Sequence, residues 1–447
     1  MRVMYVASEA TPFIKSGGLA DVIGSLPKET AKKDVESIVV IPKYQDMKFV
    51  DQIEYVTNFD IYMGWRKRYC GIFKAEVDGV TFYFIDNEQY FGRPGLYGYD
   101  DDYERFAFFD FAVLELISHL NIKPDVLQLN DWQTAMIAML YKERYCYYDY
   151  YQNIKLVFTI HNILFQGKAD PHILEEFFAL DSYLYYNGNC RNDGCLNMMK
   201  AAIFYSDVIT TVSPTYAREI LTDQYGEGLQ SILEMRKHDL YGILNGVDYD
   251  VINPSKDQTI VKKYSPRSVK TGKLENKLAL QRQVGLPEDS KVALIGIVTR
   301  LTEQKGLDLI INQFEAMCQR RVQIIILGSG DRMYEDALKG VGDGINDMTN
   351  MNNNNNNANT NTTNNTNNND IMTGIGNDAN TAVRNTTGYN ATRTATDANT
   401  ANFLGMNSTM WTWLIIAVAA AVIIALIWYY ASSNNRRTNY YDDDNNH

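Results

Sequence analysis

The residues best suited to chemistry lie near the start of the chain, in residues 15–21, which read KSGGLAD. An apolar run comes before this stretch and a helical pattern comes after it. The paired glycines Gly17 and Gly18 let backbone N–H groups approach a ligand, and the positive end of the following helix points to the same place. Lys15 adds a mobile cation, and Asp21 can accept a hydrogen bond from a sugar hydroxyl. The stretch predicts a diphosphate-binding loop, although an ordinary strand-to-helix turn fits the same residues equally well.

Other polar residues follow later apolar runs. His161 and Asn162 come directly after residues 156–160. A histidine fixed at a strand end can donate a hydrogen bond to a substrate, although a lone histidine is more often structural. Asn245 lies in an Asn-Gly turn at the end of the first series of elements. These positions are candidate binding residues at strand ends.

A pair of cations follows the apolar run over residues 291–298. Arg300 and Lys305 stand just before a helical pattern that Gly306 opens. Two cations at a helix N-terminus suit a diphosphate, and a solvated charged loop is the alternative. The GSG turn at residues 328–330 could also hold a nucleotide, but a lone G-x-G is a weak signal.

The elements that must position these residues follow an alternating pattern. Continuous apolar runs separated by helical patterns indicate parallel strands that are covered on both faces. The predicted strands are residues 3–7, 37–41, 81–85, 126–129, 156–160 and 208–212, and the predicted helices include 103–119 and 133–145. A second series starts with a strand at 291–298, a helix at 307–319 and a strand at 322–327. Ligands of such sheets bind beyond the carboxyl ends of the strands, so we expect the site in the crevice between two α/β domains.

Composition narrows the classes of function. A net charge of −12 argues against nucleic acid as a partner. The five cysteines form no C-x-x-C pair, so they fit thiols in a reducing compartment, and we predict no metal site. No signal peptide precedes the first strand, so we expect a cytoplasmic main domain.

The last quarter of the chain has a different composition. Residues 346–402 are dominated by Asn and Thr, which cannot bury enough apolar surface to fold, so we expect disorder there. Residues 411–430 carry no charge and have aromatic residues at both ends. Their length matches the roughly 20 residues that span a bilayer, which predicts a transmembrane helix and a membrane anchor. A hydrophobic tail without a membrane role is the alternative.

Together the motifs resemble those of the bacterial glycogen (starch) synthases over residues 1–338. Each motif is weak alone, whereas their joint occurrence in this order is highly specific. The motifs are Ser8-Glu9, Lys15-x-Gly17-Gly18-Leu-Ala-Asp21-Val, Asn130-Asp-Trp-Gln-Thr, Thr159-Ile-His161-Asn162-x-x-x-Gln-Gly, Thr211-Val-Ser-Pro-Thr-Tyr-Ala, Gly242-Ile-Leu-Asn245-Gly, Arg300-Leu-x-x-Gln-Lys305-Gly and Leu327-Gly-x-Gly-Asp331. The resemblance implies an α/β, two-domain, Rossmann-like glycosyltransferase of the GT-B type.

The resemblance also implies a reaction. Glucose would move from ADP-glucose to the non-reducing end of an α-1,4-glucan such as glycogen, with retention of configuration and without a metal or other cofactor. Lys15, Gly17 and Gly18 would meet the diphosphate of the donor. Arg300 and Lys305 would meet it from the other side of the cleft.

The resemblance assigns the sugar to a second set of residues. His161 would hydrogen-bond the glucosyl unit near the reacting carbon, and Asp21 and Asn162 would hold its hydroxyls. His161 and Asp21 are therefore the predicted catalytic residues. Asn245 is a further predicted substrate-binding residue.

One departure from the family concerns the second domain. In the family this domain continues further and carries a Glu-x-Gly loop whose glutamate contacts the transferred sugar. Glu335 is the last glutamate in this chain, so we expect a truncated second domain and impaired activity. The alternative function is a non-catalytic, membrane-held module that binds glucan or a nucleotide sugar. A third interpretation is that the tail is an artefact of assembly or construction that is joined to a broken synthase.

These interpretations divide the chain into six predicted segments. They are an N-terminal Rossmann-like starch synthase catalytic domain (1–250), a linker or hinge (251–290), a truncated start of a nucleotide-binding Rossmann-like domain (291–343), a disordered Asn/Thr-rich tract (344–410), a transmembrane helix (411–430) and a polar tail (431–447).

Overall fold

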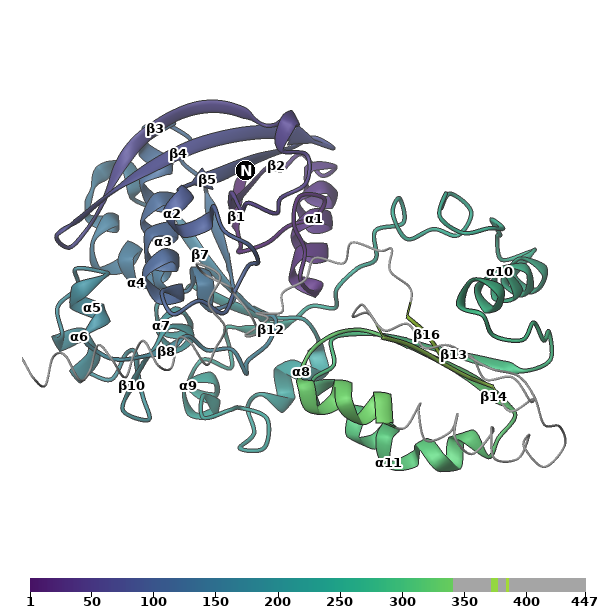
Figure 1. Ribbon diagram of the computed structural model, residues 1–447. Helices are drawn as coiled ribbons and strands as arrows, with labels where there is room; N and C mark the ends of the chain where they lie inside the picture. The colour runs from purple at the N-terminus through teal and green to yellow at the C-terminus, as the bar shows by residue number, and fades with distance from the viewer. Residues whose placement is uncertain (341–370, 377–382, 386–447) are drawn as a thin grey trace, which may run out of the picture. The chain divides into compact units, whose positions relative to one another are not determined.

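The computed structural model describes residues 1–340, 371–376 and 383–385 (Figure 1). Two sheets carry the chain's main elements. The larger sheet belongs to the N-terminal region, and the smaller one follows residue 290.

The larger sheet has nine strands in the order β12-β11-β7-β6-β1-β2-β5-β4-β3. Seven neighbouring strands, from β12 to β5, run parallel, and β4 and β3 continue the sheet as an antiparallel hairpin. The strands are β1 Arg2–Val6, β2 Glu36–Pro42, β3 Glu54–Met63, β4 Arg66–Val77, β5 Val80–Asp86, β6 Val126–Asn130, β7 Lys155–Ile160, β11 Val208–Thr211 and β12 Leu240–Gly242.

Helices connect these strands, as a parallel sheet requires. The α-helices are α1 Gly18–Ala31, α2 Glu88–Phe91, α3 Asp102–His119, α4 Met136–Glu143, α5 Ile173–Glu176, α6 Tyr183–Tyr186, α7 Met198–Tyr205, α8 Pro214–Glu219 and α9 Gln230–Met235. Short 3₁₀ segments are η1 Val50–Gln52, η2 Trp132–Thr134, η3 Tyr145–Tyr147 and η4 Asp149–Tyr151. A small antiparallel sheet of β8 Lys168–Ala169, β10 Cys195–Asn197 and β9 Arg191–Asn192 lies between β7 and α7 in the sequence.

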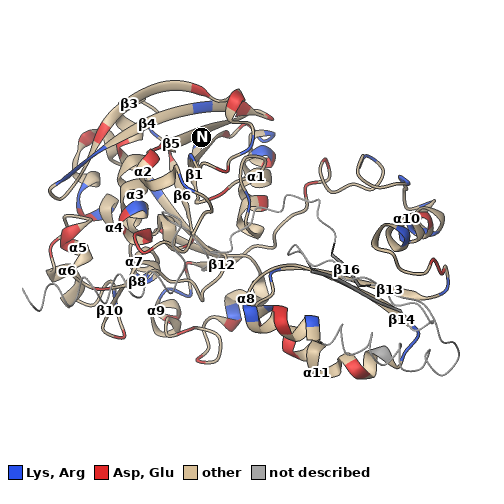
Figure 2. Cartoon of the chain, in the orientation of Figure 1, with Lys and Arg blue, Asp and Glu red and all other residues tan. Residues whose placement is uncertain are grey.

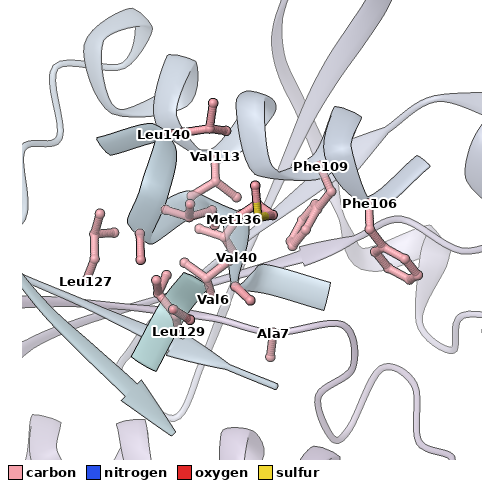
Figure 3. Packing of buried hydrophobic residues seen from close by; sticks show 14 of the residues in the cluster. Val6, Ala7, Val40, Phe106, Phe109, Val113, Leu127, Leu129, Met136 and Leu140 are labelled. Atoms are coloured by element: carbon pink, nitrogen blue, oxygen red, sulfur yellow. The ribbon is translucent and has the colours of Figure 1, made fainter. Parts of the chain in front are cut away.

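The core forms where α3 and α4 pack on the central strands. Val6, Val40 and Leu129 from β1, β2 and β6 are fully buried, and Val113 and Met136 from α3 and α4 lie against them (Figure 3). Because both faces of these strands are covered, their sequences are continuous apolar runs rather than alternating ones. This is why the predicted strands at 3–7, 37–41, 81–85, 126–129, 156–160 and 208–212 are confirmed to within two residues at each end.

The strand order reverses between β1 and β6. From β1 the chain first builds outward through β2 to β5, and it later returns to the other side of β1 with β6, β7, β11 and β12. At such a reversal the loops that follow the two central strands turn away from each other and leave an open position above the sheet. The sheet therefore favours a ligand site at the carboxyl ends of β1 and β6.

The hairpin β3–β4 was not predicted from the sequence, and one predicted helix differs in length. The hairpin β3–β4 occupies residues 54–77, where the alternating pattern of a sheet with one buried face replaces the continuous apolar runs. The predicted helix at 133–145 is shorter, because η2 and η3 take its two ends and α4 spans only residues 136–143.

The smaller sheet starts with β13 Ala293–Val298 and β14 Val322–Leu327, which pair in parallel. Helix α11 Leu307–Cys318 connects them after the 3₁₀ segment η5 Glu303–Lys305, as the sequence predicts. Leu307 and Phe314 of α11 are buried with Ile324 and Ile326 of β14. The predicted linker at 251–290 contains one regular element, α10 Val269–Val284.

The Asn/Thr-rich tract contains two strands in the structure. β15 Ile371–Gly376 pairs antiparallel with β14, and β16 Val383–Asn385 pairs with β15. The expectation of disorder does not hold for these nine positions, because β15 pairs with the edge that β14 leaves open and β16 pairs with β15. The remainder of the tract lies outside the described residues, so disorder stays a prediction there.

The predicted transmembrane helix at 411–430 and the polar tail at 431–447 also lie outside the described residues. Among the residues that are described, none of the helices combines the length and the apolar character needed to cross a membrane.

Helix α1 depends on a glycine that faces its own leading loop. A Cβ at Gly24 would lie 1.9 Å from the Thr11 hydroxyl oxygen and 2.7 Å from the Thr11 carbonyl oxygen. The same loop is fixed to the helix by a 3.0 Å hydrogen bond from the Thr11 N–H to the Ala20 carbonyl. The close approach of loop and helix thus requires the absence of a side chain at residue 24.

We expect Gly24→Ala to lower the free energy of unfolding by about 1–3 kcal/mol, because the added methyl group must displace packed backbone. Urea denaturation followed by circular dichroism measures this. Gly18→Ala is the matched control on the same helix, since a Cβ at residue 18 would contact nothing within 4 Å. Equal stability of the two variants would contradict the packing argument.

Candidate functional site

The carboxyl ends of three neighbouring strands, β1, β6 and β7, carry most of the predicted site residues. Val6 of β1 pairs with Leu129 of β6, which pairs with Phe158 of β7. The buried Asn130 side chain joins two of these ends, since its Nδ2 donates to the Val6 carbonyl at 2.9 Å. The loops after the three strands therefore start from one fixed edge.

The glycine loop after β1 is held by a buried carboxylate, Glu9. One Glu9 oxygen accepts hydrogen bonds from the Ser16 N–H and, at 3.3 Å, from the Gly17 N–H. The other oxygen accepts from the Ser16 hydroxyl at 3.0 Å. The backbone donors expected to cradle a phosphate are thus already bonded to a carboxylate of the same chain.

The backbone conformation of this loop does not require glycine at residues 17 and 18. Gly17 has φ −155° and ψ −165°, an extended conformation that other residues adopt, and it precedes the first residue of α1. A Cβ at Gly18 would meet no atom within 4 Å, and one at Gly17 would approach the Glu9 carboxylate only to 3.8 Å. The backbone conformation therefore does not require glycine at either position, and both residues border open space.

Lys15 and Asp21 form an ion pair across the mouth of this loop. The Lys15 ammonium donates to both Asp21 carboxylate oxygens, at 2.8 and 2.7 Å, and both side chains are about half exposed. The structure thus brings the two predicted residues together. A bound diphosphate would compete with Asp21 for the same ammonium.

The loop after β7 is held by a second carboxylate, Asp131. Its Oδ1 accepts from the His161 N–H at 2.8 Å and from the Asn162 N–H at 3.4 Å. Asp131 takes a positive φ of 56°, which turns its side chain from the end of β6 towards the end of β7. Burial raises the pKa of the Asp131 carboxyl, while His161 and the two backbone N–H groups oppose that rise.

The ring of His161 has a defined tautomer. Asn130 Nδ2 donates to backbone carbonyls, so Asn130 Oδ1 is the acceptor for His161 Nε2 at a distance of 3.0 Å. Burial lowers the pKa of His161, with Asp131 acting in the opposite direction, so the neutral imidazole is favoured. A neutral ring that donates through Nε2 has only Nδ1 left, as an acceptor.

Tyr97 completes the buried wall beside Glu9. Its hydroxyl lies 2.7 Å from the Ser8 hydroxyl. Burial raises the pKa of Tyr97 well above its ordinary value, and the charge of Glu9 adds to the rise. Burial likewise raises the pKa of Glu9, although the hydrogen bonds from Ser16 and Gly17 lower it. Desolvation is therefore the main cause of both pKa shifts.

Arg300 lies in the loop after β13 and Lys305 ends η5, just before α11, and both are exposed. Within the described residues, neither side chain makes a hydrogen bond or an ion pair. The backbone at Gly330 packs closely against the loop that contains Arg300, because a Cβ at residue 330 would lie 2.3 Å from the Leu301 carbonyl oxygen. The GSG turn therefore has a packing role that explains its glycines without a nucleotide.

The predicted binding residue Asn245 has no side-chain contact that would fix its position among the described residues. It is exposed on the segment after β12, and its side chain makes no hydrogen bond in the part of the chain that is described. No group of three acidic, histidine or cysteine side chains suited to a metal ion is found among those described residues.

Two carboxylates that organise the site were not among the predicted site residues. Glu9 and Asp131 both lie in quoted motifs, but their partners are 7 and 30 residues away along the chain. A buried acidic residue directly after a continuous apolar strand is the signal that could have identified them. Such a carboxylate needs donors, and the nearest are the N–H groups of loops at neighbouring strand ends.

Comparisons with known proteins place these features in context. Residues 2–235 match the family model described as the starch synthase catalytic domain. Glycogen synthase of Clostridium botulinum (strain Alaska E43 / Type E3) is 51% identical over 342 residues, which cover 76% of this chain and 71% of that protein. Glycogen synthase of Streptococcus agalactiae serotype III (strain NEM316) is 49% identical over 338 residues, covering 75% and 71%.

Among solved structures, the chain is similar to the catalytic domain of Starch Synthase IV from Arabidopsis thaliana bound to ADP and acarbose. The TM-score is 0.72 at 33% sequence identity, and the match covers 76% of this chain and 71% of that one.

Replacing Glu9 by Gln tests the buried carboxylate. Because burial raises the pKa of Glu9 above 4.5, the folded state retains a proton that the unfolded chain releases. The contribution of this proton to the free energy of unfolding is fully present below pH 4.5. It is lost as the pH rises through the raised pKa of Glu9. We expect the free energy of unfolding of the wild type, relative to Glu9→Gln, to fall across this window by about 1.4 kcal/mol per unit of pKa shift.

Urea titrations at several pH values measure that difference. Glu29→Gln makes the same chemical change at an exposed site of α1 and should alter the free energy of unfolding by less than about 0.5 kcal/mol. A difference between wild type and Glu9→Gln that stays constant with pH would show that Glu9 does not hold the proton.

Proposed function

The chain belongs to the family of glycogen and starch synthases, and from this membership we propose that it transfers glucose from ADP-glucose to the non-reducing end of an α-1,4-glucan. The observation that carries the proposal is the shared edge of the sheet at the carboxyl ends of β1, β6 and β7. The glycine loop with the Lys15–Asp21 pair follows β1, and His161 follows β7. The comparisons favour this enzyme over the alternative of a non-catalytic module.

The donor's diphosphate is the group that needs most help. When the bond between the anomeric carbon and the phosphate oxygen breaks, negative charge builds on the diphosphate. Lys15 meets that charge beside the open space at Gly17 and Gly18, and Arg300 and Lys305 supply positive charge from the second domain. Since Glu9 already occupies the Ser16 and Gly17 N–H groups, side-chain cations carry this role.

The sugar is held by the groups at the ends of β6 and β7. The anomeric carbon loses its phosphate oxygen and gains the O4 oxygen of the acceptor, whose proton leaves on the departing ADP. His161 Nδ1 accepts a hydrogen bond from a glucosyl hydroxyl, and Asn162 binds a second hydroxyl. Asp21 binds a third hydroxyl once the diphosphate has taken its Lys15 partner. Asn245 is an additional contact at the rim.

The incorporation of labelled glucose from ADP-glucose into glycogen tests the proposed function directly. We expect transfer that increases with protein concentration and that yields α-1,4 linkages sensitive to amylase. The match to the Clostridium botulinum relative covers 71% of that protein, and the assay uses all 447 residues of this chain. Absence of transfer above background at millimolar donor would contradict the proposal.

Gly18→Ala separates the ligand-binding role of the loop from a structural one. A methyl group at residue 18 enters open space, so stability should be unchanged within about 0.5 kcal/mol. The same methyl group should weaken ADP-glucose binding about tenfold or more, because it occupies the approach of the diphosphate. Calorimetry with ADP-glucose measures the affinity, and unaltered affinity would exclude close approach of the donor.

Lys15→Ala and Arg300→Ala test the cations. Loss of a charged hydrogen bond to phosphate should weaken ADP-glucose binding about ten- to hundredfold in each variant. Lys32→Ala is the matched control, because Lys32 pairs with Glu29 at the far end of α1. Unchanged affinity in both Lys15→Ala and Arg300→Ala would remove the diphosphate role.

The cytoplasmic location expected from the sequence stays a prediction.

A further inference from the structure

Lys28 lies in the last turn of α1, and its ammonium group is surrounded by carboxylates. The ammonium nitrogen lies 3.0 Å from Asp78, 3.3 Å from Asp250 and 3.7 Å from Asp248. The Lys28 side chain is only 12% exposed. An ammonium group has three N–H donors and no acceptor, so it can serve several carboxylates at once. These four residues are called the Lys28 cluster below.

The Lys28 cluster joins three segments that are far apart along the chain. Lys28 belongs to α1 and Asp78 to the turn between β4 and β5, whereas the other two members follow β12. Val77 pairs directly with Val80 across this turn. Asp78 and Gly79 between them both have positive φ, as a two-residue hairpin turn requires. The turn therefore gives the cluster one carboxylate on a rigid support.

The segment after β12 has few other contacts that hold it. Of the described residues 243–252, all are exposed except Asp248. The Ile243 N–H donates to the Thr211 carbonyl at 2.8 Å, where the strand pairing ends. Beyond that point, and among the described residues, every hydrogen bond or ion pair that joins residues 244–252 to the region of the larger sheet goes to Lys28. Apolar burial therefore contributes little to the path of this segment.

The charges of the Lys28 cluster depend on one another. The hydrogen bond to Asp78 is the main cause of the raised pKa of Lys28, and it outweighs the opposing effect of burial. Lys256, at 3.0 Å, and then Lys28 hold the pKa of Asp250 below its usual value. Figure 2 shows both acidic and basic residues on α1. Within the described residues, Lys28 is the one cation that all three carboxylates share, so its removal leaves them to repel one another.

Helix α1 connects the Lys28 cluster to the candidate site. Asp21 and Lys28 are seven residues apart, which is about two helical turns, so they lie on the same face of α1. Asp21 pairs with Lys15 beside the glycine loop. Asn245, a predicted substrate contact, stands three residues before Asp248. One helix therefore connects the glycine loop to the segment that carries Asn245.

We propose that Lys28 is a positioning residue, which fixes the path of residues 244–252 and so places Asn245 against the donor. It acts through the carboxylates of the Lys28 cluster and touches no reacting atom. The effect on donor binding rests on the proposed function, whereas the anchoring of the segment does not.

Lys28→Met tests the anchoring in the full chain, because it removes the charge and keeps an unbranched apolar stem in the same space. Tyr249 is 76% exposed and offers a chymotrypsin site within the segment. We expect cleavage after Tyr249 to become about tenfold faster, because the segment leaves its fixed path more often. Mass spectrometry of the products measures this rate, and urea denaturation shows that the variant is folded.

Calorimetry with ADP-glucose measures the positioning effect. A misplaced Asn245 should weaken binding about fivefold, the usual value of one hydrogen bond. In transfer to glycogen, the KM for ADP-glucose should rise by the same factor with kcat little changed. Lys32→Met is the matched control, because Lys32 lies one turn further along the chain and pairs with Glu29 at 2.6 Å.

A double-mutant cycle tests whether the carboxylates carry the effect. In the background Asp248→Asn/Asp250→Asn, adding Lys28→Met should change the cleavage rate and the ADP-glucose affinity by less than about twofold. The reason is that Lys28 then has no charge on the segment to bind. An undiminished effect of Lys28→Met in that background would mean that packing of the stem is the cause, and the inference would be wrong.

Wild-type cleavage and affinity in Lys28→Met, or equal changes in Lys32→Met, would overturn the inference. Faster cleavage with unchanged ADP-glucose affinity would overturn it too, because the anchored segment would then not place Asn245.

Failure of this inference is distinguishable from failure of the proposed function. If the wild type binds ADP-glucose and transfers glucose, and Lys28→Met does both equally well, the positioning role alone is wrong. If the wild type binds no ADP-glucose, the transferase proposal fails and the positioning role fails with it, whereas a cleavage rate that depends on Lys28 still establishes the anchor.

Discussion

The site depends on one constraint, that backbone N–H groups at the ends of buried parallel strands need acceptors. Two carboxylates supply them. Glu9 binds the N–H groups of Ser16 and Gly17 in the loop after β1, and Asp131 binds those of His161 and Asn162 after β7. Each carboxylate is desolvated, which raises its pKa, and each regains stability through these hydrogen bonds. The hydrogen bonds from the loop N–H groups to these two carboxylates therefore set the geometry of both loops.

Under the proposed function, the loop after β1 would bind a diphosphate in a different way from a glycine-rich turn with free N–H groups. In many α/β folds the free N–H groups of a glycine-rich turn bind the phosphate. In this chain those donors are bonded to Glu9, so the loop offers space at Gly17 and Gly18 and charge from Lys15. The same logic fixes the imidazole of His161, whose Nε2 bonds to Asn130 and whose remaining nitrogen is an acceptor. Both loops are set before a ligand arrives, which lowers the cost of ordering the site on binding.

The hairpin β3–β4 shows a different use of the same sheet. Its inner residues complete the core against α3, and its period of two leaves the outer residues free to vary. Tyr55, Tyr62 and Tyr69 at outward positions of the hairpin are about half exposed or more, so they add little to the core.

The sequence by itself determined the parallel strands, the connection of β13 through α11 to β14, and the family, because continuous apolar runs and ordered motifs are local features. It did not reveal β3 and β4, whose alternating pattern has only one buried face, nor the strands β15 and β16 within a polar tract. Only the tertiary structure decided the role of the glycines, since the space around Gly18 depends on atoms distant in sequence. It also identified Glu9 and Asp131 as the groups that hold the loops, because a carboxylate's partners are set by which strand ends the sheet order brings together.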